Sequence, residues 1–278
     1  METIAETDAT PAAPEPTPGT PRKPAKASGA GSRVVALLGE LMIIVGALLG
    51  LYVVWQLFYT DIEANSIQAD TVHDLPWAYA PQNTSPITAG QPNSDQPETI
   101  PNELKLSPDT APVMDEPKQA TTFATFYVPR WGENYVKPIS EGVDRHKILD
   151  RLGIGHYPNT GMPGALGNFA ISAHRTTYGK PFNRIAEIKK GDHLIVQTKE
   201  AWYVYRVTSH EIVRPTAVKV IAPVPNKPGA APDDHYITMT SCHPMFSAAE
   251  RYVVHGVLEY WSPVGNGVPE ELLEVPAK

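Results

Sequence analysis

Thiols are nearly absent from this chain of 278 residues, which contains a single cysteine. One cysteine excludes an intramolecular disulfide framework, and it also excludes a zinc site built from several thiolates. An excess of basic residues is absent too, because the formal net charge is −7. Nucleic-acid binders usually carry a basic excess, so this balance argues against a nucleic-acid partner.

Proline, by contrast, is abundant, with 29 residues or roughly twice its usual share. Residues 1–33 and 61–120 are rich in it, and residues 61–120 also carry ten acidic side chains against Lys105 and Lys118. Proline removes backbone donors, and these segments have little apolar surface to offset the entropy of ordering. We therefore expect residues 1–33 to be a disordered tail and residues 61–120 to be an extended acidic stalk.

Residues 34–60 form a long apolar run between these two segments. Within Leu41–Tyr59 the only strongly polar side chain is Gln56. At 1.5 Å per residue this stretch is about 28 Å long, close to the roughly 30 Å hydrocarbon core of a bilayer. It is longer than the apolar core of a signal peptide, about 7–15 residues, so we predict an uncleaved transmembrane anchor.

The charges that flank this anchor predict its orientation. Four basic residues precede it, whereas acidic residues follow it with no base before Lys105. By the positive-inside rule, the N-terminus stays in the cytoplasm and everything after residue 60 is exported. We therefore predict a single-pass membrane protein whose folded part is extracellular.

From residue 121 the pattern changes to short runs rich in β-branched and aromatic residues. These runs predict strands at residues 124–131, 167–174, 193–198, 201–213, 236–241 and 251–261. In the last run Tyr252, Val254, Leu258 and Tyr260 alternate with other side chains, which indicates that one face of this strand packs on a core.

Helical signals are short by comparison and lie near residues 146–152 and 181–189. Many short strands with few helices indicate a mainly β domain over residues 121–262, folded as a closed or nearly closed barrel. Residues 263–278 are expected to form a polar C-terminal tail.

Cys242 lies in the part of the chain that is predicted to be exported, at the end of a predicted strand. The dipeptide His243-Pro244 follows it and ends that strand. A lone thiol outside the cell is exposed to oxidation, so its presence suggests a catalytic use. A buried structural thiol and metal or disulfide chemistry are the alternatives. A catalytic thiol reacts as the thiolate and needs a nearby base or cation.

Of nine histidines, His174 is the best candidate for that base, because it too closes an apolar run and precedes polar turn residues. His243 is a poor candidate, because neighbours on an extended chain point to opposite sides. Arg251 opens the next predicted strand, so the connection can bring it to the same rim as Cys242. Its guanidinium could hold an oxyanion or a substrate carbonyl.

These segments together resemble the sortase family. The stretch TMTSCHP (238–244) is similar to the sortase cysteine signature, and residues 155–175 resemble the segment that carries the sortase histidine. Sortases also place an arginine at the start of the next strand, as Arg251 is placed here. The residues that follow Cys242 are most similar to class E sortases, the housekeeping type of high-GC Gram-positive bacteria. The resemblance covers about residues 122–262.

The resemblance implies a closed eight-stranded β-barrel with no cofactor and no metal. Cys242 would attack the Thr–Gly carbonyl of an LAxTG- or LPxTG-like sorting motif near the C-terminus of an exported protein. His174 would protonate the leaving amine and later deprotonate the incoming one, and Arg251 would bind substrate carbonyls and the oxyanion. The amine of the peptidoglycan precursor lipid II, or a similar amine, would then accept the sorted protein.

Three other functions are considered. A class C sortase joins pilins through a lysine and often carries a lid with an Asp-Pro-aromatic motif, to which Asp74-Leu-Pro-Trp77 is weakly similar. An anchored barrel that only binds wall material would be no enzyme. An L,D-transpeptidase would show a Ser-x-Gly-Cys-Arg context, which Thr-Ser-Cys-His at residues 240–243 does not match.

Overall fold

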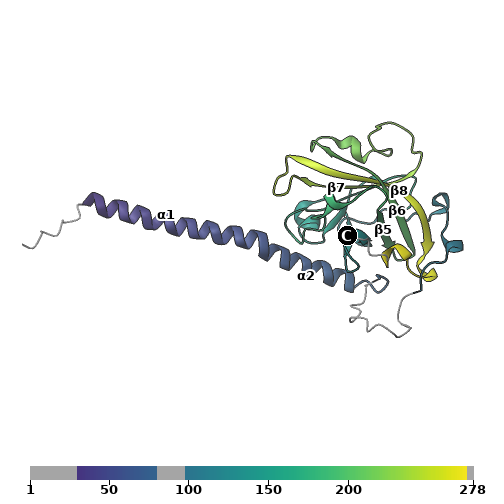
Figure 1. Ribbon diagram of the computed structural model, residues 1–278, viewed down its shortest axis with the longest axis horizontal. Coiled ribbons are helices and arrows are strands. Elements are labelled where there is room, and N and C mark those ends of the chain that lie inside the picture. The colour runs from purple at the N-terminus through teal and green to yellow at the C-terminus, as the bar shows by residue number, and fades with distance from the viewer. Residues whose placement is uncertain (1–29, 80–97, 274–278) are drawn as a thin grey trace, which may run out of the picture. The chain divides into compact units, whose positions relative to one another are not determined.

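The computed structural model describes residues 30–79 and 98–273 (Figure 1). The N-terminal elements are α1 (Ala30–Val54), a π-helical turn η1 (Trp55–Tyr59) and α2 (Thr60–His73). Residues Gly31–Val54 are long and apolar enough to cross a membrane, and their side chains are exposed. The predicted anchor is thus helical but begins before residue 34, and most of the predicted tail lies outside the described residues.

Eight strands of the described residues close into a barrel, which confirms the predicted fold. The strands are β1 (Thr122–Tyr127), β2 (Val136–Glu141), β3 (Ile154–His156), β4 (Gly167–Ser172), β5 (His193–Thr198), β6 (Ala201–Val213), β7 (His235–His243) and β8 (Glu250–Pro263). Around the barrel they follow the order β1-β2-β3-β4-β7-β8-β6-β5. The pairs β2–β3 and β4–β7 are parallel, and the other neighbours are antiparallel.

Short helical turns precede, connect and follow these strands. They are η2 (Asn102–Leu104), η3 (Pro108–Thr110), η4 (Pro129–Trp131), η5 (Arg145–Leu149), η6 (Ile185–Glu187), η7 (Val218–Ile221), η8 (Val264–Asn266) and η9 (Glu270–Leu272). The predicted strand over residues 124–131 ends at Tyr127, because η4 begins at Pro129. β2 and β3 were not predicted: Pro138 interrupts the first, and the second is only three residues long.

The barrel interior is a single buried apolar cluster to which most strands contribute. Tyr252 and Val254 of β8 point into it, as their alternation predicts. Among its fully buried side chains are Phe126, Ile139, Ile154, Phe169, Phe182, Leu194, Ile237 and Met239. Burying a side chain of this size contributes about 1.5–3 kcal/mol, so the interior holds the strand ends that carry the polar residues in fixed positions.

A bulge in β8 changes the predicted face of Tyr260. Val204 of β6 pairs with Tyr260 but Tyr205 pairs with Leu258, so Glu259 is an extra residue on β8. One extra residue reverses which side the following side chains face. Leu258 therefore packs in the barrel interior, whereas Tyr260 packs in a second buried cluster.

The start of the predicted stalk is a helix that packs on the barrel. The buried residues of α2 include Asp61, Ala64, Gln68 and Val72, whose spacing of three or four places them on one helix face. Lys137 of β2 donates to Asn65 Oδ1 at 2.6 Å and to Gln68 Oε1 at 2.8 Å. The first part of residues 61–120 therefore differs from the expected extended stalk, because polar contacts hold it to β2.

Residues 98–120 also lie on the barrel, as a chain without strands or long helices that contains the short turns η2 and η3. Leu106 makes a β-bridge with Trp261 of β8, and Tyr203 donates its hydroxyl to the Pro112 carbonyl at 2.7 Å. The C-terminal residues are equally attached, since Leu272 is buried and Tyr260 donates to Glu271 Oε2 at 2.6 Å. These contacts differ from the expected stalk and polar tail, whose parts at 80–97 and 274–278 lie outside the described residues.

Candidate active site

The cysteine and the arginine singled out in the sequence are neighbours across the β7–β8 hairpin. Cys242 near the end of β7 pairs with Arg251 near the start of β8. Directly opposite residues of an antiparallel pair place their side chains on the same face, with Cβ atoms about 4.5–5.5 Å apart. The Cys242 thiol is partly exposed. Arg251 Nη1 donates to the carbonyls of Ala248 at 3.0 Å and Glu250 at 2.9 Å. Its other two guanidinium nitrogens make no hydrogen bond to the described part of the chain and could bind a ligand.

His174 reaches the same end of the barrel from the neighbouring strand β4. Ser172 pairs with Thr240 in the parallel β4–β7 ladder, so both His174 and Cys242 lie two residues beyond that pair. The ladder continues past the end of β4, because Ala173 N donates to the Thr240 carbonyl at 3.3 Å. The structure thus brings Cys242, Arg251 and His174 together at one barrel end, although their catalytic roles stay predictions.

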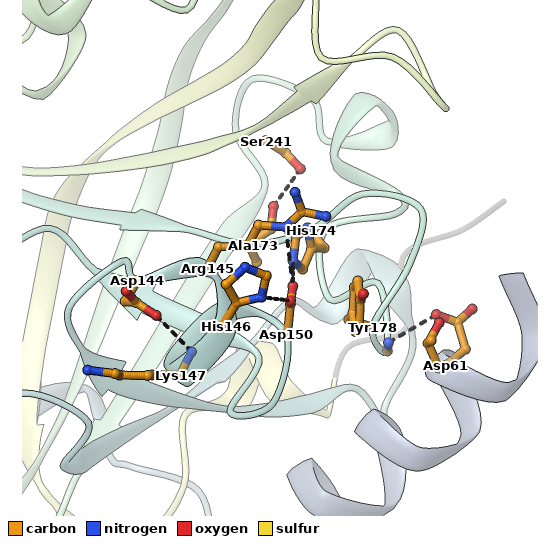
Figure 2. A network of polar contacts seen from close by, with 12 residues as sticks. Asp61, Asp144, Arg145, His146, Lys147, Asp150, Ala173, His174, Tyr178 and Ser241 are labelled. Atoms are coloured by element: carbon orange, nitrogen blue, oxygen red, sulfur yellow. Dashed lines mark hydrogen bonds and ion pairs between the residues drawn. The ribbon is translucent and has the colours of Figure 1, made fainter. Parts of the chain in front are cut away.

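A buried carboxylate, which the sequence reasoning missed, holds the His174 ring. His174 Nε2 lies 2.6 Å from Oδ1 of Asp150, which follows η5, and Asp150 is 8% exposed (Figure 2). The carboxylate accepts, so Nε2 of the neutral ring carries the proton and Nδ1 is an acceptor. Burial lowers the pKa of His174, and the hydrogen bond to Asp150 opposes that effect. No feature of the sequence connects a carboxylate 24 positions upstream with this histidine.

A second residue that the sequence analysis missed is Arg175, which contacts the backbone of Cys242. Its Nη1 donates to the Cys242 carbonyl at 3.2 Å and lies 2.8 Å from His243 Nδ1. The side chain is 6% exposed, and its guanidinium lies over the Tyr252 ring. His243 pairs with Glu250 and so faces the other side of the ladder from the thiol, as alternation predicts.

Helix α2 supports the loop that follows His174. The ring of Tyr178 lies beside the His174 ring, with centroids 5.3 Å apart and planes tilted by 34°, and the Tyr178 carbonyl accepts from Gln68 Nε2 at 3.2 Å. The next residue, Gly179, donates its N–H to Asp61 Oδ1 at 3.0 Å. Its φ of +77° and a Cβ that would lie 2.8 Å from Gln68 Nε2 require glycine here.

The Asp74-Leu-Pro-Trp77 segment lies on a different part of the barrel. The Trp77 carbonyl accepts from Gln197 Nε2 at 2.7 Å, and Gln197 belongs to β5. β5 is three positions from β7 in the order of the barrel. In this structure the segment is therefore bound to β5 rather than placed over Cys242 as a lid.

The chemistry of this barrel end is that of a nucleophile, an acid–base group and a cation. A thiol on a partly exposed residue can attack a carbonyl, a largely buried imidazole can transfer protons, and a guanidinium can bind an oxyanion. Within residues 30–79 and 98–273, no three His, Cys, Asp or Glu side chains gather as ligands for one metal ion. The arrangement suits acyl transfer through a thioester.

Comparison with known proteins agrees with this geometry. Residues 126–259 match the Sortase domain family. Sortase SrtE1 of Streptomyces coelicolor is 32% identical over 260 residues, which cover 91% of this chain; the chain spans only 65% of the length of SrtE1. Sortase SrtE2 of the same species is 31% identical over 238 residues, covering 82% of this chain and 83% of SrtE2. The solved SrtA sortase from Actinomyces oris has a TM-score of 0.58 and 43% identity, covering 63% of this chain and 99% of that structure.

Proposed function

The chain belongs to the sortase family, whose members are cysteine transpeptidases, and we propose that it is a membrane-anchored sortase of the class E type. The observation that carries the proposal is the pairing of Cys242 with Arg251 beside the loop of His174. The similarity to SrtE1 and SrtE2 favours class E. The contacts of Trp77 with β5 give no support to a class C lid.

In the proposed reaction the Cys242 thiol gives its proton to Nδ1 of His174, and the sulfur attacks the Thr carbonyl carbon of an LAxTG- or LPxTG-like motif. The carbon–nitrogen bond to Gly breaks, and His174 gives its proton to the leaving amine. Arg251 donates to the oxyanion while the carbon is tetrahedral. The amine of lipid II, or a similar wall precursor, then attacks the thioester, its proton passes to His174, and the thiolate is released.

The proposal includes the place of the enzyme in the cell. α1 is long and apolar enough to anchor the chain in the cell membrane. Basic residues precede it and acidic residues follow it, which favours a cytoplasmic N-terminus and an extracellular barrel. Exported proteins that carry the sorting motif would then meet the thiol on the outer side of the membrane.

Trapping the thioester tests the function. We would incubate the full chain in detergent micelles with an LAxTG peptide, with and without an amine acceptor, and measure intact mass. We expect a mass gain equal to the peptide minus its leaving group, transfer to the added amine, and loss of both in Cys242→Ala. The matched control is His193→Ala, which changes a histidine on β5.

Peptide cleavage by Cys242→Ala at the wild-type rate would refute the proposed nucleophile. Binding of peptide with no covalent adduct and no cleavage in the wild type would instead support a non-enzymatic binding module. An LPxTG peptide and a lysine-bearing acceptor, used in parallel, would identify the preferred motif and amine.

A further inference from the structure

Among the residues that the structure describes, the one well-shielded partner of the Asp150 carboxylate is His174. Its carboxylate lies 2.6 Å from His174 Nε2, and the Asp150 side chain is 8% exposed. Its other neighbours, His146 Nδ1 at 3.1 Å and Arg145 Nε at 3.8 Å, belong to side chains that are 83% and 65% exposed. Solvent screens such exposed contacts, so the bond to His174, whose side chain is only 16% exposed, is the strong one.

The turn that carries Asp150 is itself fixed. Asp144 caps η5 by accepting from the Lys147 N–H at 2.8 Å, and Ile148 of the same turn is fully buried. Asp150 N donates to the Arg145 carbonyl at 2.7 Å. The carboxylate therefore belongs to a rigid element, as a group that orients another side chain must.

We propose that Asp150 is the positioning residue of the active site: it fixes the His174 ring so that Nδ1 is directed to the reacting groups, and it stabilises the imidazolium that forms when His174 holds a proton. The inference rests on the proposed acid–base role of His174. A ring bound at Nε2 cannot rotate freely and keeps one tautomer when neutral, so the proton always enters and leaves through Nδ1.

The charged groups around His174 determine how its pKa changes when one of them is removed. Asp150 and, more weakly, Asp61 of α2 favour the imidazolium, whereas Arg145 and burial disfavour it. Burial is the largest influence on the pKa of His174 and lowers it, whereas the charge of Asp150 raises it. When the Asp150 charge is removed, burial lowers this pKa with less compensation. The pKa of His174 is therefore expected to fall further when Asp150 is neutral.

Asp150→Asn is the test, because it keeps the shape of the side chain and removes its charge. In the full chain we expect kcat to fall about 100-fold with little change in KM, since a displaced general acid costs rate rather than binding. NMR titration of the imidazole, assigned by the signal missing in His174→Ala, should show the pKa of His174 at lower pH. Asp150→Glu restores the charge and should recover part of both values.

The matched control is Asp144→Asn, which removes an acidic charge from the same turn but keeps a side-chain oxygen that can accept from the Lys147 N–H and so cap η5. In the described residues Asp144 makes no contact with His174. Equal kcat values and equal His174 titrations in Asp150→Asn and Asp144→Asn would overturn the inference. Activity retained in His174→Ala would instead refute the proposed acid–base role. An inactive His174→Ala beside a fully active Asp150→Asn would refute only the positioning role.

Discussion

Lys137 provides a quantitative test of the contact between α2 and the barrel. The amine is largely buried beneath α2, and this burial lowers its pKa from 10.5 to about 8, with Asp61 opposing the change. Between those two values the unfolded chain binds more protons than the folded chain, so the free energy of unfolding rises with pH. Each pKa unit corresponds to 1.36 kcal/mol, and the full difference therefore amounts to about 3 kcal/mol, gained above pH 10.5 and absent below about pH 8.

The test compares wild type with Lys137→Met, in which the group that titrates is missing. Unfolding of the full chain in detergent micelles would be followed by circular dichroism at pH 7.5 and pH 9.5. The wild type should gain about 2 kcal/mol over that interval relative to the variant. Loss of the two hydrogen bonds to Asn65 and Gln68 will lower the stability of Lys137→Met at both pH values, so only the pH-dependent difference matters.

The exposed Lys190, replaced by Met, serves as the control and should keep the wild-type pH dependence. If wild type and Lys137→Met gained stability in parallel from pH 7.5 to pH 9.5, the amine would be in contact with water. The conclusion that α2 packs closely on β2 and shields the Lys137 amine would then have to be abandoned.

Three further outcomes are expected. Arg251→Lys should lower peptide turnover about 10²–10³-fold, because an ammonium cannot bind the loop carbonyls and an oxyanion together as the planar guanidinium does. The pH dependence of the rate at which a small reagent alkylates Cys242 should change little in this variant. If the variant instead raised the pKa of the Cys242 thiol and regained full turnover at high pH, Arg251 would be a group that stabilises the thiolate. His243→Ala should keep substantial turnover, since the His243 ring faces away from the thiol, whereas His174→Ala should lose transpeptidation. Equal losses of turnover in the two variants would mean that the base is wrongly assigned. Protease added to intact protoplasts should digest residues 121–278 and spare the N-terminus, as antibodies to each end can show, and a protected barrel would contradict the orientation.

The barrel could be predicted because its strands carry their signal in side-chain alternation. Tyr252 and Val254 show this signal clearly in β8, and the apolar run that leads to Cys242 shows it in β7. The same pattern could not reveal the bulge at Glu259, because an extra residue leaves no mark in hydropathy. It could not reveal β2 either, since Pro138 is a residue that strands usually exclude.

The packed helix α2 escaped prediction for a different physical reason. Two of the buried residues on its face, Asp61 and Gln68, are polar and attach the helix through hydrogen bonds. A hydrophobic periodicity therefore could not appear, and the acidity of the segment suggested an extended chain. The candidate site shows the same limit: Cys242 and His174 end apolar runs and stand out, whereas Asp150 becomes its neighbour only in three dimensions.

Because segments outside the barrel pack on it, the part of the chain that matches the sortase family model is smaller than the part that folds. Residues 126–259 match the family, yet the second buried cluster includes Ile100, Tyr260 and Leu272, which lie outside that range. Trp261 bonds through its indole N–H to the Ser107 carbonyl at 3.1 Å, and Tyr260 packs with Ile100 and Leu272. A fragment cut at the limits of the family match would lack these residues, and it would expose the side chains of Tyr127, Trp202 and Val204 that pack in the same cluster. If such a fragment aggregated, the cause would be the apolar side chains exposed by the truncation. Its aggregation would therefore say nothing about the stability of the barrel in the full chain.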